Sequence, residues 1–229
     1  MKRITAITEA PAMPSEPAHP RAIEPAVQSI KAEPGVLVHT AADRRLAAGH
    51  WLLAAHASPR FARTQWQTHG VALLPLGALF SAIRIPGRLV QAVVASTDPC
   101  DIDAVLDETL GGGPVICDVH GPRYYALVPA SVPRTWRQAV EDWQAHEVAC
   151  LGHGAYLGVP RPDAVEFPLH RGGSYWSVPV ESVGSLCKPL AVARLIAAGV
   201  HELDENREPW PVDAPLTPRH GAPDGTVRE

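Results

Sequence analysis

Proline is concentrated at the two ends of the chain, and this distribution limits how much of the sequence can fold around a core. Residues 1–36 contain six prolines among small and charged residues, and residues 206–229 contain five prolines with no apolar periodicity. Proline removes a backbone donor, and such segments bury too little apolar surface to offset the entropy lost on ordering. We therefore expect a disordered arm at 1–36, one folded domain at 37–205 and a disordered tail at 206–229.

Between these ends, segments with helical spacing alternate with short apolar segments that have the composition of β-strands. Capping residues and apolar spacing predict helices within 41–66, 98–112, 131–147 and 188–203. Apolar runs bounded by turn residues predict strands at 71–77, 78–85 and 172–180, and hairpins at 114–129 and 148–160. Residues 88–96 fit either a helix or a strand. Helices interleaved with hairpins indicate an α+β domain with a largely antiparallel sheet.

Arginine is unevenly distributed along a chain whose formal net charge is −4. That net charge argues against a surface devoted wholly to nucleic acid. Residues 60–100 nevertheless hold four arginines and one acid, and residues 120–140 hold three arginines and no acid. Such runs are typical either of a local groove that binds phosphate or of an ordinary solvated face, and the sequence leaves both interpretations open.

The cysteines and the apolar runs indicate a broad class of protein. Cys100, Cys117, Cys150 and Cys187 lie far apart with no CxxC pair, which disfavours a zinc site and is typical of reduced thiols. The N-terminus lacks the apolar stretch of a secretory signal, and no uninterrupted run of about 18 apolar residues is present. We therefore expect a cytoplasmic protein with no membrane partner.

Three segments, in this order, carry a resemblance to a known family. They read WQTHGVALLPLGALFSAIRIPG, GGPVICDVHGPRYYALVP and VACLGHGAYLGVPRPDAVEFPLHRGGSYW, and they run from Trp66 to Trp176. Their order, and a framework of glycines with Tyr156, Pro160 and Tyr175, resemble the bifunctional DNA primase/polymerase (Prim-Pol) domain of the archaeo-eukaryotic primase superfamily. The resemblance implies an RRM-like sheet packed with helices, and it links the chain to DNA replication or to mobile elements.

The same correspondence puts unsuitable residues where that family has its catalytic side chains. The three metal-binding acids fall at Arg84, Pro86 and Ala149, and the histidine that contacts nucleotide falls near Tyr124. Mg²⁺ needs oxygen ligands, and the side chains of arginine, proline and alanine supply none. We therefore expect no metal, no cofactor and a catalytically degenerate domain that binds nucleic acid or nucleotide without transferring it.

Side chains that such a domain could use for binding are of three kinds. Arginines offer a fork of donors to phosphate, exposed aromatic residues on strands can stack on bases, and two histidines occupy glycine turns. The candidate residues are Arg84, Arg88, Arg123, Arg134, Arg137, Tyr124, Tyr125, Tyr156, Tyr175, Trp176, His120 and His153.

Two other functions are compatible with the same residues. In one, the domain is a protein-interaction or regulatory scaffold, and its proline-rich ends bind another protein. In the other, it is an active DNA primase/polymerase whose metal ligands have moved, with Asp118 of the neighbouring hairpin as a carboxylate that could face the same cleft. Two-metal catalysis requires ligands for both ions, and one carboxylate seldom holds such a pair. The sequence therefore favours the non-catalytic domain.

Overall fold

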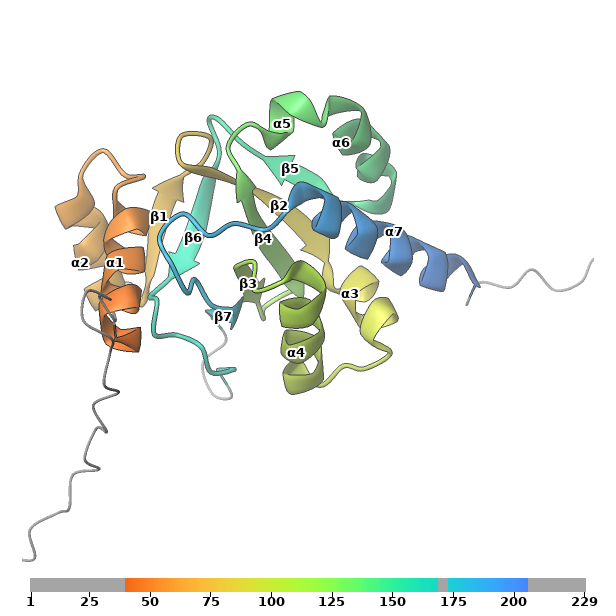
Figure 1. Ribbon diagram of the computed structural model, residues 1–229, viewed down its shortest axis with the longest axis horizontal. Helices are drawn as coiled ribbons and strands as arrows, with labels where there is room; N and C mark the ends of the chain where they lie inside the picture. The colour runs from red at the N-terminus through yellow and green to blue at the C-terminus, as the bar shows by residue number, and fades with distance from the viewer. Residues whose placement is uncertain (1–39, 169–172, 206–229) are drawn as a thin grey trace, which may run out of the picture. The chain divides into compact units, whose positions relative to one another are not determined.

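The computed structural model describes residues 40–168 and 173–205, all of which lie in one compact unit that begins at His39. The arm predicted at 1–36 and the tail predicted at 206–229 lie outside the described residues. Within the described part, the chain has the mixed α+β structure and the antiparallel main sheet that the sequence predicts (Figure 1).

Five strands form the main sheet in the spatial order β5-β2-β4-β3-β7, and every neighbouring pair is antiparallel. Their bounds are Phe80–Pro86 (β2), Val115–Asp118 (β3), Arg123–Pro129 (β4), Ala149–Leu151 (β5) and Ser174–Val178 (β7). Helices connect β2 to β3 and β4 to β5. These four strands therefore follow a β-α-β-β-α-β path, which is the connectivity of ferredoxin-like folds.

The described residues also contain seven α-helices and one short 3₁₀ helix. Their bounds are Ala41–Leu53 (α1), Pro59–His69 (α2), Gly87–Val94 (α3), Pro99–Leu110 (α4), Val132–Thr135 (α5), Arg137–Trp143 (α6), Gln144–His146 (η1) and Pro189–Glu205 (α7). The ambiguous segment 88–96 is thus mostly helical. The single helix predicted at 131–147 is broken at Trp136, where φ of −114° and ψ of 30° leave the helical region.

Side-chain caps explain where two of these helices begin. The Thr40 hydroxyl accepts a hydrogen bond from the Asp43 N–H at 3.1 Å, and the Asp43 carboxylate accepts one from the Thr40 N–H at 3.1 Å. This reciprocal pair is a capping box, in which Thr40 is the N-cap of α1 and Asp43 lies in its first turn. Asp98 caps α4 by accepting from the Cys100 N–H at 2.8 Å, and the left-handed Gly111 ends that helix.

Strands β1 (Val71–Pro75) and β6 (Tyr156–Pro160) form a separate two-stranded antiparallel sheet. The hairpin predicted at 148–160 is therefore wrong, because β5 pairs with β2 in the main sheet while β6 pairs with β1. The apolar alternation of β6 explains the separation. Leu157 and Val159 are buried in the same core as Ala72 and Leu74 of β1, so pairing with β1 buries the apolar face of β6.

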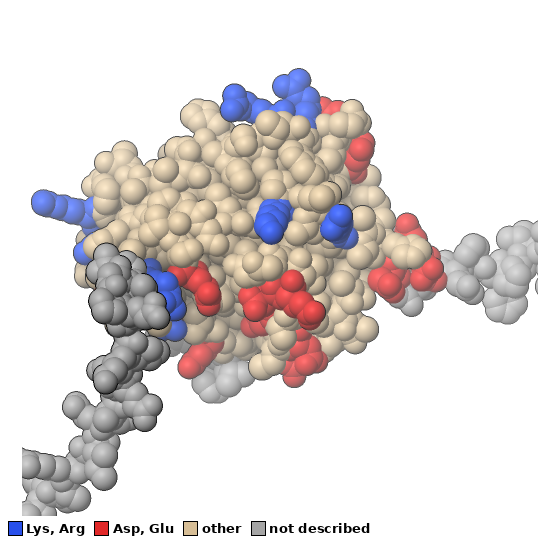
Figure 2. Space-filling model, viewed as in Figure 1, with Lys and Arg blue, Asp and Glu red and all other residues tan. Residues whose placement is uncertain are grey.

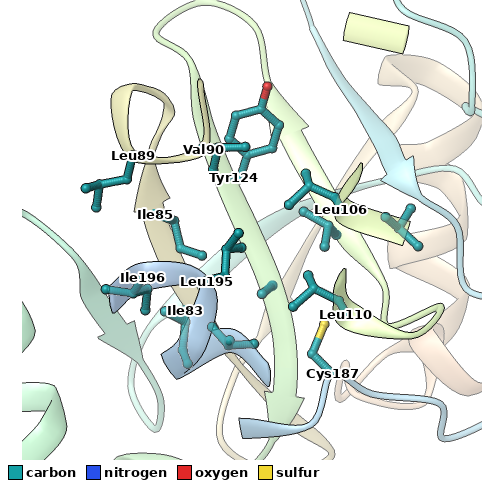
Figure 3. Close-up of a cluster of buried hydrophobic side chains, with 14 of the residues drawn as sticks. Ile83, Ile85, Leu89, Val90, Leu106, Leu110, Tyr124, Cys187, Leu195 and Ile196 are labelled. Atoms are coloured by element: carbon teal, nitrogen blue, oxygen red, sulfur yellow. The ribbon is translucent and has the colours of Figure 1, made fainter. Parts of the chain in front are cut away.

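The main sheet separates two hydrophobic cores, because successive residues of a strand face opposite sides. On one face, Ile83 and Ile85 pack with residues of α3, α4, α6 and α7 (Figure 3). On the other face, Phe80 and Ala82 pack with the small sheet, α1 and α2. The next residue on that second face is Arg84, which lies half-buried near the end of β2.

A partly buried carboxylate joins α4 to the edge strand β7. Asp103 accepts hydrogen bonds from the Tyr175 hydroxyl at 3.0 Å and from the Ser177 hydroxyl. Tyr175 and Ser177 are both buried, so this carboxylate satisfies two hydroxyls that have little access to water. Burial raises the pKa of Asp103, and hydrogen bonds from the two hydroxyls offset part of that rise.

We expect the wild-type protein to gain stability relative to an Asp103→Asn variant as the pH falls from about 7 towards the ordinary aspartate pKa of about 3.9. The raised pKa means that folded Asp103 holds a proton more readily than the unfolded chain does, so protonation favours folding in this window. Urea unfolding at several pH values measures the difference. A Ser177→Ala variant loses a donor to the carboxylate, so its free energy of unfolding should rise more steeply than that of wild type as the pH falls. A free energy of unfolding that decreases over this pH range, relative to Asp103→Asn, would contradict a raised pKa of Asp103.

Candidate anion-binding site at the end of strand β2

Residues from three distant segments meet where β2 ends. In the register of the main sheet, Arg84 of β2 lies opposite Ala149 of β5 on one side and opposite Tyr125 of β4 on the other. Two residues further along, Pro86 lies opposite Arg123. Directly opposed residues on neighbouring strands have Cβ atoms about 5 Å apart. Arg84, Pro86 and Ala149 therefore lie close together at the end of β2.

An open pocket of about 530 Å³ lies beside these positions. Its charged lining comes from four elements or loops: Arg84 from β2, Arg88 from α3, Arg123 from β4 and Glu147 from the residue after η1. Uncharged residues complete the lining, and they are Pro86, Gly87, Gln91, Gly121 and Pro122. Three guanidinium groups thus share this pocket with one carboxylate.

A close backbone approach sets the geometry of the pocket. Gly87, the first residue of α3, donates its N–H to the Pro122 carbonyl in the β3–β4 turn at 2.7 Å. A Cβ atom on Gly87 would lie 2.6 Å from the Pro122 Cβ, which is closer than real Cβ contacts. Glycine therefore lets the turn rest on the start of α3, and this contact brings Arg88 and Arg123 to the same pocket.

The charges in the pocket are only partly paired. Arg88 Nη1 donates to Glu147 Oε2 at 2.5 Å, and Arg88 Nη2 donates to the His146 carbonyl at 3.2 Å. The hydrogen bond from Arg88 lowers the pKa of Glu147, and the charges of Arg88, Arg123 and Arg84 lower it further. Among the residues that the structure describes, neither Arg84 nor Arg123 forms an ion pair. The pocket therefore has the electrostatic character of an anion-binding site.

Acidic side chains near the pocket do not form a metal site in the described part of the chain. No group of three or more His, Cys, Asp or Glu side chains there is placed to hold a metal ion. Asp118 lies opposite Arg123 in the register but is not among the residues that line the pocket. Its carboxylate instead accepts from the His120 N–H at 3.2 Å and lies 3.7 Å from His120 Nδ1.

Most of the predicted base-stacking residues are not exposed. Tyr124, Tyr175 and Trp176 are 4%, 2% and 1% exposed, so these three rings do not present a stacking face at the surface. Tyr124 and Tyr175 face the core under α3, α4 and α7, and Trp176 faces the opposite core. Tyr156 is exposed but belongs to the small sheet. Of the five candidates, only half-buried Tyr125 lies opposite a pocket residue, Arg84.

The remaining candidate residues are dispersed. Arg134 on α5 and Arg137 on α6 are exposed and do not line the pocket, and Figure 2 shows basic side chains over α5 at the upper edge of the molecule. His120 lies in the β3–β4 turn near the end of β2, whereas His153 lies against Gly77, before β2 begins. A seven-residue strand spans about 20 Å. The two histidines therefore lie near opposite ends of β2.

Glu147 is the charged pocket residue that sequence reasoning missed. It ends the segment 131–147, which the sequence predicts as one helix, and its partner Arg88 lies 59 residues away. The only signal that could have placed Glu147 here is its position two residues before Ala149. Gln91, on the next turn of α3 after Arg88, was missed for the same reason, because pairing between distant segments brings it to the pocket.

Comparisons of the chain with protein-family models, with curated proteins and with solved structures find no match. In the described residues, no helix has both the length and the apolar character needed to cross a bilayer.

We expect a Gly87→Ala substitution to destabilise the protein by about 1–3 kcal/mol, because the added methyl group overlaps the β3–β4 turn. Urea unfolding measures the loss. Gly121→Ala is the matched control in the same turn, since a Cβ there would meet nothing within 4 Å. Its effect should stay within about 0.5 kcal/mol. Equal effects of the two substitutions would contradict the close approach of Gly87 and Pro122.

Proposed function

We propose that this domain binds the phosphate groups of a nucleotide or of single-stranded nucleic acid at the arginine pocket, and that it does not catalyse nucleotidyl transfer. The observation that carries the proposal is the pocket itself, in which Arg84, Arg88 and Arg123 converge with Glu147 as the one acid in the lining. Arginine presents planar, bidentate donors that match phosphate oxygens, and it remains charged at every physiological pH.

The resemblance to Prim-Pol domains supports the same proposal. The residues that correspond to the family's acids are Arg84, Pro86 and Ala149, and the register places Arg84 beside Ala149. Guanidinium groups repel divalent cations and attract phosphate, so the residues now at this position favour the opposite kind of ligand. The β-α-β-β-α-β connectivity of the main sheet agrees with the RRM-like sheet that the resemblance implies. On this basis we also propose a role linked to DNA replication or mobile elements.

The size of the pocket favours a few phosphate contacts rather than a long binding face. The pocket occupies about 530 Å³, and the chain as a whole carries a formal net charge of −4. Two or three phosphates on a single strand would give a slope of roughly −1.4 to −2.1 in a plot of log binding constant against log salt concentration. Duplex-binding proteins with extended basic surfaces show much steeper slopes.

We expect a fluorescently labelled single-stranded oligonucleotide of about a dozen nucleotides to bind at about 50 mM salt, with the modest slope given above. Arg84→Ala and Arg123→Ala should each weaken binding about tenfold, because each removes charge-assisted hydrogen bonds to phosphate. Fluorescence anisotropy measures both effects. Arg134→Ala is the matched control, since Arg134 is exposed and lies outside the pocket. Absence of binding, or equal weakening by Arg134→Ala, would overturn the proposal.

We expect no primer extension or primer synthesis with Mg²⁺ or Mn²⁺, because no oxygen ligand stands at Arg84, Pro86 or Ala149. A gel assay with a primed and an unprimed template measures this directly. Template-dependent synthesis that follows the folded protein through purification would show an active enzyme with relocated metal ligands.

A protein-interaction scaffold is the second candidate function, and a different surface favours it. The outer face of the small sheet exposes Leu73 (53%) on β1 and Tyr156 (65%) on β6, while the inner residues of both strands are buried. Exposed apolar patches of this kind are typical of interaction sites. Two results together would favour the scaffold. The protein would bind no oligonucleotide in any assay, and it would bind itself or another protein in a way that Leu73→Ser abolishes.

A further inference from the structure

The pocket contains an anion of its own. The Glu147 carboxylate binds Arg88 Nη1 at 2.5 Å, in the geometry that a phosphate oxygen would take on the same guanidinium. Arg84 and Arg123 line the same pocket from β2 and β4, and their charges lower the pKa of this carboxylate. A ligand phosphate that enters the pocket therefore meets one arginine already occupied and two that are not ion-paired in the described structure.

The backbone of Glu147 is fixed, whereas its side chain is free to move. Glu147 has a left-handed backbone with φ of 62°, and its N–H donates to the Gln144 carbonyl at 3.0 Å. The next residue, Val148, is 1% exposed and anchors the chain in the core. The Glu147 side chain, in contrast, is 70% exposed. Rotation about its side-chain bonds would release Arg88 without any change in the fold.

We infer that Glu147 is a resident competitor for phosphate, which a bound ligand displaces from Arg88 and which limits the affinity of the pocket. This inference rests on the proposed phosphate-binding function. Ligand oxygens first engage Arg84 and Arg123, and Arg88 joins them once the carboxylate turns into solvent. Exposed ion pairs are weak, so displacement costs little, and the expected penalty from Glu147 is about two- to fivefold in affinity.

The opposite role for Glu147 makes the opposite prediction. If the carboxylate served to hold Arg88 in the orientation that binds phosphate, removing its charge would weaken binding. A competitor and a positioning residue therefore differ in the sign of the effect of one substitution. Glu147→Gln keeps the shape of the side chain and removes only the charge, which makes it the suitable variant.

The experiment compares binding of the labelled oligonucleotide, and of inorganic tripolyphosphate as its competitor, across seven proteins. These are wild type, Glu147→Gln, Glu147→Asn, Arg88→Ala, the double variant Glu147→Gln with Arg88→Ala, Arg84→Ala, and the control Glu141→Gln. Glu141 is an exposed acid on α6 that does not line the pocket, so it tests for a general effect of net charge. Thermal melting checks that each variant folds, and Glu147→Asn, which suits the left-handed backbone, is the second variant.

We expect Glu147→Gln and Glu147→Asn to bind the oligonucleotide about two to five times more tightly than wild type. The gain should shrink in the Arg88→Ala background, because the competition is for that guanidinium. Weaker or unchanged binding by Glu147→Gln, or an equal gain in affinity in Glu141→Gln, would overturn the inference that Glu147 competes for Arg88. Oligonucleotide binding by wild type would still support the phosphate site in that case. Failure of every variant to bind would overturn the phosphate site itself.

Discussion

The register of β2 against β4 and β5 is the constraint on which the site depends. It places Arg84 between Ala149 and Tyr125 on one face of the main sheet. A slip of one residue would turn every side chain of β2 to the other face. Ile83 and Ile85 are 0% and 1% exposed, so such a slip would remove two large apolar side chains from the core. Burial of the isoleucines thus determines where the arginine lies.

The charge of the side chains at the end of β2 determines which kind of ligand the pocket there can bind. In the proposed account, the loss of catalysis and the gain of phosphate binding are two consequences of the same residues. In this proposal, Arg84 offers donors to phosphate where the resembled family has a metal-binding acid, and Arg88 and Arg123 add positive charge to the same pocket. The contact of Gly87 with Pro122 holds these groups together, because it fixes the β3–β4 turn against the start of α3. In the same proposal, Glu147 competes with the ligand for Arg88.

Capping residues and turn residues predicted much of the fold from the sequence. Strand pairs and side-chain contacts between distant segments could not be predicted in this way. Asp98 and Gly111 mark the ends of α4, and a short glycine turn marks the β3–β4 hairpin. The run 148–160 carries an equally clear glycine turn, yet its two strands join different sheets through long-range pairing with β2 and β1. The candidate site shows the same division. The resemblance brought Arg84 near Ala149, but only the structure shows that Glu147 faces Arg88.

Titration of the protein with tripolyphosphate, followed by NMR of the arginine side-chain Nε–H groups, tests the central claim most directly. We predict saturable shifts at Arg84 and Arg123, accompanied by a shift at Arg88 as its bond to Glu147 is replaced. Saturable shifts confined to arginines outside the pocket, or no shift at any arginine, would contradict a phosphate site at the end of β2.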